Sequence, residues 1–466
     1  MLRLSPYLRV SDTLSGGTVE FVAPRELKIY VCGLTVYDYA HIGHARTILT
    51  FDVLYRSAEA RGFTVRYLQN FTDVDDKIID RAARAGIEPL ELAERFIAEA
   101  LRDFDSLNVK RPTMMPRATQ HIQAMHRIIR GLIEGGHAYV TPSGVYFSVS
   151  TFPEYGKLSK RRVDQLLAGA RVEPDPYKRD PVDFALWKVY DSGPLWDSPW
   201  GRGRPGWHIE CSAMINEHLG DTIDIHGGGA DLVFPHHENE IAQSESYTGK
   251  PLARAWMHVG LLNLGSEKMA KSVGNVIRIR DAVAKWGPNT LRTYLLSSHY
   301  RSLLDFSMEG LRKAHENWRI IESAAYDVLE EPPSGSSGEP EALSYFEEFD
   351  RALATDLDTP SAISAFVKLS RYVGRLRSEG RLGSAGSELG EAFRLMFNVM
   401  GYALPSGPLP EDVSRLVAER SRLRSEGRFS EADAIREELR SRGYELVDLR
   451  GRTYVRAVER PSFDVP

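Results

Sequence analysis

The 466-residue sequence has few cysteines and no long apolar run. Its two cysteines, Cys32 and Cys211, cannot form a disulfide framework for so long a chain, and they are typical of a reducing compartment. No stretch approaches the roughly 18 uninterrupted apolar residues of a membrane span, and residues 1–17 lack the apolar core of a secretory signal. We therefore expect a soluble, cytoplasmic protein with no membrane partner.

An excess of basic charge is also missing. The formal net charge is -5, which excludes a polycation that binds nucleic acid indiscriminately, so any such binding must be local. No lysine follows Lys368, so phosphate contacts of the C-terminal region would come from arginine. The hydrophobic content of 42% and charged content of 26% are typical of globular proteins. At roughly 150 residues per domain, the length suits about three structural units.

Apolar patterning predicts an α/β fold in the first 300 residues. Residues 27–32 alternate as in a strand, 42–62 fit a helix and 63–68 fit a second strand. Such units build Rossmann-like parallel sheets with helices on both faces. Further strands are expected at 222–226 and 255–262.

A region with a different sequence pattern separates the two halves of this predicted sheet. Residues 122–133 fit a helix, 138–149 fit a hairpin, and 157–204 are irregular and rich in Pro, Asp and Trp. We interpret this region as an insertion that splits the predicted sheet domain. The predicted division is a first half at 1–115, a connective insertion at 116–205 and a second half at 206–307.

After residue 307 the sequence predicts long amphipathic helices. They are expected at 308–330, 341–355, 358–377 and 386–400, with a flexible linker at 331–340. Two more helices, at 411–427 and 430–442, precede a hairpin at 444–457. The expected organisation is a helical bundle at 308–404 followed by a small α+β domain at 411–466.

Two histidines at the start of the first expected helix are candidates for phosphate binding. His41 and His44 flank Gly43, where the amides of a helix N-terminus favour anions. In an ATP clamp the imidazoles would donate hydrogen bonds, and Gly43 would leave room for the nucleotide. By spacing alone, a surface helix start with two ordinary histidines is the alternative.

A later loop carries Lys268 and Lys271, whose ammonium groups could neutralise charge on departing pyrophosphate. A solvated surface pair is the alternative.

A zinc site is the third candidate functional site, after the histidine pair and the lysine pair. Cys32 ends the first strand, Cys211 lies near a helix start, and His236 and Glu240 share one helix face. Two thiolates, an imidazole and a carboxylate suit Zn²⁺. Because no close pair of cysteines is present, two buried thiols beside a polar helix end are the alternative.

Together these motifs resemble the class I aminoacyl-tRNA synthetases. His-Ile-Gly-His at 41–44 follows a strand, and Lys-Met-Ala-Lys-Ser follows at 268–272. Longer segments resemble the cysteinyl-tRNA synthetase family, and they lie at 67–77, 206–214, 224–229 and 234–240. The resemblance implies a ligase that activates cysteine with ATP and Mg²⁺ and transfers it to tRNA(Cys).

The resemblance also implies site residues. The catalytic residues would be His41, His44, Lys268 and Lys271. ATP would be bound by His41, Gly43, His44, Gly228, Gly229 and Lys271. The amino-acid pocket would be lined by Thr35, Trp207, His226 and Asp231. One Zn²⁺ per chain would be held by Cys32, Cys211, His236 and Glu240. Two positions depart from the family pattern: Leu34 replaces a common Pro, and Ala270 replaces the usual Ser of the lysine loop.

Zinc would also account for selectivity between cysteine and serine. Rejecting serine by about 10⁴ requires roughly 5.4 kcal/mol of differential binding. Shape alone cannot supply this, whereas a borderline-soft metal favours a thiolate over a hydroxyl.

Two rival functions remain. One is a ligase that gives cysteine to the amine of an amino sugar, as in mycothiol synthesis; residues 411–466 argue against it because they resemble an anticodon-binding module. The other is a non-catalytic zinc- or tRNA-binding protein, which the retained histidines and lysines disfavour. The expected partners are tRNA(Cys), cysteine and ATP, and the expected state is a monomer. Arginines at 415–428 could form an RNA-binding face or intrahelical ion pairs.

Overall fold

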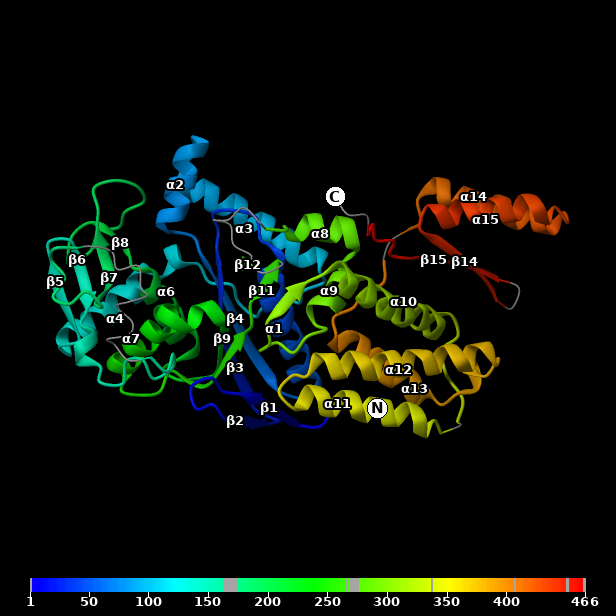
Figure 1. Ribbon diagram of the computed structural model, residues 1–466, viewed down its shortest axis with the longest axis horizontal. Helices are drawn as coiled ribbons and strands as arrows, with labels where there is room; N and C mark the ends of the chain where they lie inside the picture. The colour runs from blue at the N-terminus through cyan, green and yellow to red at the C-terminus, as the bar shows by residue number, and fades with distance from the viewer. Residues whose placement is uncertain are drawn as a thin grey trace.

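A parallel β-sheet lies at the centre of the computed structural model (Figure 1). The structure describes residues 2–161, 175–264, 267–268 (backbone only), 276–336, 338–405, 408–449 and 452–463. The sheet has the order β10-β9-β3-β4, and its strands are β3 (Glu26–Thr35), β4 (Thr64–Thr72), β9 (Ile223–Gly229) and β10 (Ala253–Val259). All neighbouring pairs are parallel. The strand β3 pairs with β4 on one side and with β9 on the other. Where the connections diverge in this way, a crevice forms outside the carboxyl ends of the two strands β3 and β9.

Alternation along β3 assigns its side chains to two helical layers. Leu27, Ile29 and Val31 pack in the core that contains α1 (Ile42–Ala60), the crossover helix between β3 and β4. Tyr30 and Cys32 pack with α6 (Trp207–Leu219) and α7 (Glu238–Thr248) on the other face. Two short irregular helices, η3 (Ala230–Leu232) and η4 (Val233–His237), lead into α7. The predicted α/β, Rossmann-like class is confirmed.

An antiparallel sheet of order β5-β6-β7-β8 lies beside α4 and α6, at the left in Figure 1. The elements between β4 and α6 are α2 (Asp76–Ala85), α3 (Pro89–Ser106), η1 (Ala118–His121), α4 (Ile122–Glu134), β5 (Ala138–Thr141), β6 (Gly144–Phe147), η2 (Val149–Thr151), β7 (Phe184–Val189) and β8 (Gly203–Pro205). The prediction that 157–204 is irregular is wrong where β7 lies. This strand pairs with β6, about 40 positions away, so the local sequence pattern did not predict it.

The predicted strand at 255–262 is also corrected. It is divided at Gly260 between β10 and β11 (Leu262–Leu264), and β11 belongs to a separate sheet of order β12-β11-β13. The other elements of this region are β12 (Glu267–Lys268), α8 (Ile279–Trp286), α9 (Pro288–Leu295) and β13 (Leu304–Phe306).

A helical bundle and a small two-helix unit with a hairpin complete the right side of Figure 1. The bundle contains α10 (Met308–Glu330), α11 (Pro340–Ala354), α12 (Thr359–Ser378), η6 (Leu382–Ser384) and α13 (Ser387–Val399). The terminal unit contains α14 (Glu411–Ser425), α15 (Phe429–Ser441), β14 (Tyr444–Leu449) and β15 (Arg452–Ala457). No helix in the described ranges is both long and apolar enough for a membrane span. The domain boundaries stay a prediction.

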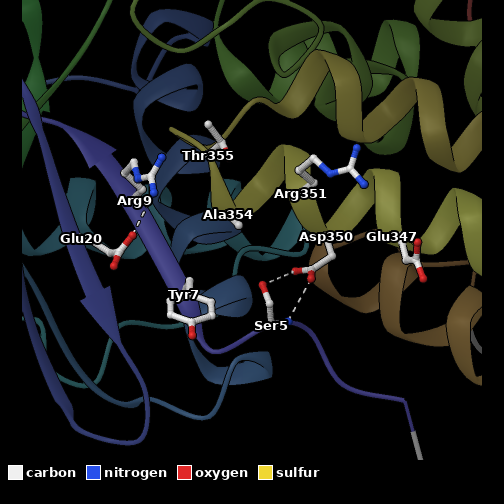
Figure 2. A pocket seen from close by; sticks show the side chains of 9 residues that line it. All are labelled: Ser5, Tyr7, Arg9, Glu20, Glu347, Asp350, Arg351, Ala354 and Thr355. Carbon is white, nitrogen blue, oxygen red and sulfur yellow. Dashed lines mark hydrogen bonds and ion pairs between the residues drawn. The ribbon is translucent and has the colours of Figure 1, made fainter.

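An N-terminal hairpin, β1 (Tyr7–Ser11) with β2 (Thr18–Val22), was not predicted and lies against the bundle. Figure 2 shows the groove of about 510 Å³ between β1 and α11. The Ser5 backbone N–H and hydroxyl donate to the Asp350 carboxylate at 3.0 and 3.2 Å. The buried Arg61 guanidinium also donates to Asp350, at 2.7 Å. These contacts fasten the N-terminal segment to α11.

Candidate active site

A cavity of about 500 Å³ opens at the carboxyl ends of β3 and β9. Eight residues predicted for the site line it: Cys32, Thr35, His41, Gly43, His44, Trp207, Gly229 and Asp231. They come from segments far apart in the sequence, as expected at a switch point of a parallel sheet. Gly228 and His226 lie next to this wall in β9, and His226 is fully buried.

The two histidines predicted as a phosphate clamp stack at the start of α1. Their ring centroids lie 3.7 Å apart at an interplanar angle of 23°. The His41 backbone N–H donates to His44 Nδ1 at 3.3 Å. A Cβ on Gly43 would lie 2.9 Å from His41 Nδ1, so this ring position depends on glycine. The arrangement presents two imidazoles and a helix N-terminus to one cavity, a setting that favours phosphate.

A β-bulge positions Cys32 at this edge of the sheet. The pairing of β3 with β4 passes from Val31 opposite Gln69 to Leu34 opposite Phe71, so two β3 residues face one β4 residue. The Gly33 N–H donates to Asn70 Oδ1 at 2.8 Å. A Cβ on Gly33 would lie 1.6 Å from the Asn70 carbonyl oxygen, so the bulge requires glycine.

The four predicted metal ligands meet behind the cavity wall, and all are buried. The Cys32 and Cys211 sulfurs are 3.8 Å apart, and Cys211 Sγ is 3.5 Å from His236 Nε2. Glu240 Oε1 lies 3.5 Å from Cys32 Sγ and 2.9 Å from His236 Nε2. Tetrahedral zinc would hold two sulfurs about 3.8 Å apart and a sulfur and a nitrogen about 3.5 Å apart. The donor set therefore fits zinc in both composition and spacing.

Neighbouring side chains orient these donors. His208 Nδ1 lies 2.9 Å from His236 Nδ1, so the other His236 nitrogen, Nε2, is left for the donor cluster. The Trp207 indole stacks on His236 with centroids 4.1 Å apart. His226 Nε2 lies 2.7 Å from Glu240 Oε2, which leaves the other Glu240 oxygen toward the sulfurs.

The cluster holds negative charge in a buried environment. Burial opposes ionisation of Glu240, but His226 and His236 hold its pKa well below the usual range. Burial also opposes the thiolate of Cys211, yet hydrogen bonding to Cys32 and His236 lowers its pKa to about 6. Burial and the neighbouring Cys211 raise the pKa of Cys32 well above its usual value. A thiolate and a carboxylate facing one imidazole favour a bound cation.

Sequence reasoning missed His237, which completes a second possible donor set with Cys32, His226 and Glu240. His237 Nε2 lies 3.3 Å from Cys32 Sγ, and its Nδ1 lies 2.8 Å from His258 Nε2. The adjacent histidines at 236 and 237 were visible in the sequence. Only His236 was predicted as a ligand, because it lies four residues before Glu240 on the same helix face.

Sequence reasoning also missed an aromatic row beside the Cys32 cluster. Tyr30, His226 and Trp256 are neighbours in register across β3, β9 and β10. The His226 ring stacks on Trp256 with centroids 4.4 Å apart. Alternation from Cys32 could have indicated Tyr30, because residues two apart share a strand face.

The lysine pair is not placed by the structure. Lys271 lies outside the described residues, and Lys268 is described only as backbone paired with Asn263.

The arginines of α14 engage acidic side chains. Arg420 is buried and donates twice to Asp448, while Arg422 pairs with Glu419 and Glu426. The two pairs of Arg422 are the intrahelical kind named as the alternative, whereas Arg420 pairs with β14.

Two families of known proteins match this chain. The family described as "tRNA synthetases class I (C) catalytic domain" matches residues 18–316, and "Cysteinyl-tRNA ligase anticodon binding domain" matches 406–456.

Two curated relatives illustrate the similarity. The "Cysteine--tRNA ligase" of Aquifex aeolicus is 43% identical, covering 95% of this chain and 97% of that protein. The protein of the same description from Caldicellulosiruptor saccharolyticus is 45% identical, covering 95% and 98%.

Among solved structures, a Mycobacterium tuberculosis methionyl-tRNA synthetase in complex with methionyl-adenylate shares the fold, with a TM-score of 0.58 at 16% identity over 81% of this chain and 89% of that one. The chain belongs to the cysteine–tRNA ligase family of class I aminoacyl-tRNA synthetases.

Proposed function

We propose that this chain forms cysteinyl-adenylate from cysteine and ATP and transfers the cysteinyl group to the 3′ end of tRNA(Cys). One observation carries the proposal. A buried cluster of two thiols, an imidazole and a carboxylate reaches the cavity through Cys32, and the same cavity is lined by His41 and His44. A thiol-bearing substrate and a nucleotide phosphate therefore have adjacent binding surfaces.

Cys32, Cys211, His236 and Glu240 would hold one zinc ion. When bound, zinc supplies a borderline-soft Lewis acid that prefers a thiolate to a hydroxyl. Glu240 is the oxygen ligand, and we expect it to be the weakest held.

Other residues of the cavity position the substrates. Thr35 and Trp207 line the amino-acid side, with His226 behind them in β9, and the Asp231 carboxylate is suited to pair with an α-ammonium group. We assign Gly228 and Gly229 to ATP binding. A Cβ on Gly229 would lie 2.6 Å from Asp231 Oδ1, and one on Gly228 would lie 2.9 Å from the buried His237 ring.

In the first step the cysteine carboxylate attacks the α-phosphate of ATP in line, and pyrophosphate leaves. His41 and His44 donate hydrogen bonds to phosphate oxygens as charge moves toward the leaving group. Lys268 and Lys271 neutralise the same charge, and Mg²⁺ accompanies ATP. In the second step a ribose hydroxyl of the terminal tRNA adenosine takes the acyl group and AMP leaves.

The C-terminal unit supports tRNA, rather than an amino sugar, as the acceptor. Residues 406–456 match an anticodon-binding family, and α14, α15 and the β14–β15 hairpin form a unit at the far end of the molecule (Figure 1). A ligase for a small amine has no use for such a module.

Pyrophosphate exchange tests the proposal. The purified wild-type chain should contain zinc in the Cys32 cluster, and its pyrophosphate exchange should be about 10⁴-fold more efficient with cysteine as the amino acid than with serine. It should then charge total tRNA with cysteine. Cys211→Ser should lose the zinc of this cluster and most of this preference, and chelation of the wild-type metal should also abolish the preference.

A conservative variant away from the cavity, Ser378→Ala, serves as the control and should behave as wild type. Exchange that does not depend on cysteine would refute the ligase. Cysteine preference that survives removal of the metal would refute the role of zinc.

A further inference from the structure

A second cluster of metal-ligating side chains lies at the opposite end of α6 from Trp207. His121 ends η1, and Glu217 and His218 are in the last turn of α6. One potential ligand atom from each lies within 4.8 Å of the others. His121 is buried, His218 is half-buried and Glu217 is exposed, so the cluster is accessible from solvent. None of the three lines the cavity of the proposed active site.

The His121 ring is held as metal-binding histidines usually are. His121 Nδ1 lies 2.6 Å from the Arg117 carbonyl oxygen, and a carbonyl only accepts, so Nδ1 carries the proton. In the neutral imidazole the lone pair is then on Nε2. A histidine that binds a metal typically donates its other N–H to a backbone carbonyl in this way.

This lone pair points to a second imidazole. His121 Nε2 lies 2.7 Å from His218 Nε2. The third donor, Glu217, also forms an ion pair with Arg127 at 2.8 Å through Oε2.

We propose that His121, His218 and Glu217 bind a late first-row divalent cation such as Zn²⁺, separately from the Cys32 cluster. Two imidazoles and one carboxylate suit this class of metal, with water as the remaining ligand. Two nitrogens bound to tetrahedral zinc lie about 3.3 Å apart, so the rings would separate by roughly 0.6 Å. The half-buried His218 side chain provides that movement.

The bound ion would tie together two parts of the fold. His121 is the N-cap residue of α4, and His218 lies one residue before the end of α6. A metal between them would link the start of the α4 region to the helix that carries Trp207 and Cys211. Binding to the folded state alone would also raise the thermal midpoint of the protein.

Cobalt titration of the metal-free, full-length protein tests the proposal. Co²⁺ in the Cys32 cluster gives sulfur-to-cobalt charge-transfer absorption, whereas Co²⁺ at His121 and His218 gives only ligand-field bands. The wild-type chain should bind two equivalents. His218→Gln should bind one and keep the charge-transfer band, and Cys211→Ser should keep the equivalent that lacks it.

His137→Gln is the matched control. His137 also belongs to the region between β4 and α6, but it contacts Thr151 and is in no three-donor cluster within the described residues, so two equivalents should remain. A wild-type chain that binds no equivalent lacking the charge-transfer band would overturn the proposal and leave the histidine pair as a simple hydrogen bond. A second equivalent that persists in both His121→Gln and His218→Gln would also overturn it. Because only the Cys32 cluster contains sulfur, an equivalent without the charge-transfer band reports on the second site, and failure of the proposed zinc at the active site would remove that band alone.

Discussion

Gly43 controls where the His41 ring can lie. A Cβ at this position would approach two atoms of the ring, Nδ1 at 2.9 Å and Cε1 at 3.0 Å. The ring is the end of a rotatable side chain, so it can move without disturbing α1. A substitution here therefore changes the proposed phosphate contact while the helix is kept.

Gly43→Ala should lower cysteine-dependent pyrophosphate exchange by about tenfold or more, because His41 must turn away from the phosphate position. Alanine favours a helix over glycine, so the thermal midpoint and the zinc content should stay at the wild-type values. Gly374→Ala in α12, where a Cβ would meet nothing within 4 Å, is the control. A Gly43→Ala enzyme with unchanged exchange would show that the stacked ring is not used.

Lys271→Ala should lower the same exchange by more than about tenfold and leave the zinc content unchanged, because the ammonium group is proposed to act on the leaving pyrophosphate. Lys313→Ala removes an exposed lysine that pairs with Glu316 and should have no effect. Near-normal exchange by Lys271→Ala would contradict its assigned role.

At the scale of the element, α10 carries a buried carboxyl group at the junction with the C-terminal segment. Burial raises the pKa of Glu322 to about 7, although Arg319 opposes the shift. The Glu459 backbone N–H donates to Glu322 Oε1 at 3.2 Å. The folded protein therefore holds a proton on Glu322 at pH values where the unfolded chain has released it.

Glu322→Gln should stabilise the protein at pH 8 more than at pH 5. The raised pKa contributes stability that is present below about pH 4.5 and is lost as the pH rises through 7. Glutamine has no charge to bury, so the gain at pH 8 should be of the order of 2 kcal/mol. Thermal denaturation at both pH values measures it, with the exposed Glu316→Gln in the same helix as control. Equal shifts at the two pH values would exclude this titration.

At the scale of the whole molecule, ion pairs join the C-terminal unit to the rest. Arg456 in β15 donates to Asp327 at 2.5 Å and to Glu330 at 2.7 Å, both in α10. Farther along, the Glu459 carboxylate accepts from the Asn289 backbone N–H at 2.8 Å, at the start of α9. The unit is thereby held in a defined position relative to the sheet, as the proposed transfer of cysteine to tRNA would require.

Arg456→Ala should reduce tRNA charging by fivefold or more, by about 1 kcal/mol, while pyrophosphate exchange stays unchanged. The substitution removes the ion pairs from β15 to Asp327 and Glu330 of α10, whereas the proposed adenylate formation takes place in the distant cavity. Arg442→Ala is the control, since Arg442 pairs with Asp412 and Glu438 inside the terminal unit. Parallel losses in both assays would indicate general destabilisation instead.

Local sequence patterns were sufficient to predict an element where its apolar repeat is long and regular. The bundle helices α10 to α13 begin and end within one residue of the predicted ranges, and α1 and β3 were identified by period alone. The strand β7 was missed because its partner β6 is far along the chain. The β1–β2 hairpin, docked on α11, was missed as well.

The sequence by itself determined the fold class, the family and the residue types of the candidate site, because short motifs and periodicity are local properties. Only the tertiary structure decided which side chains meet. It brought Cys32 within 3.8 Å of Cys211 across 179 positions, placed His237 beside Cys32, and brought the ring nitrogens of His121 in η1 and His218 in α6 within 2.7 Å of each other. The spacing of residues along the chain shows which side chains share a face of one helix or strand. Distances between remote segments, and the pKa shifts of buried groups, depend instead on how the layers pack.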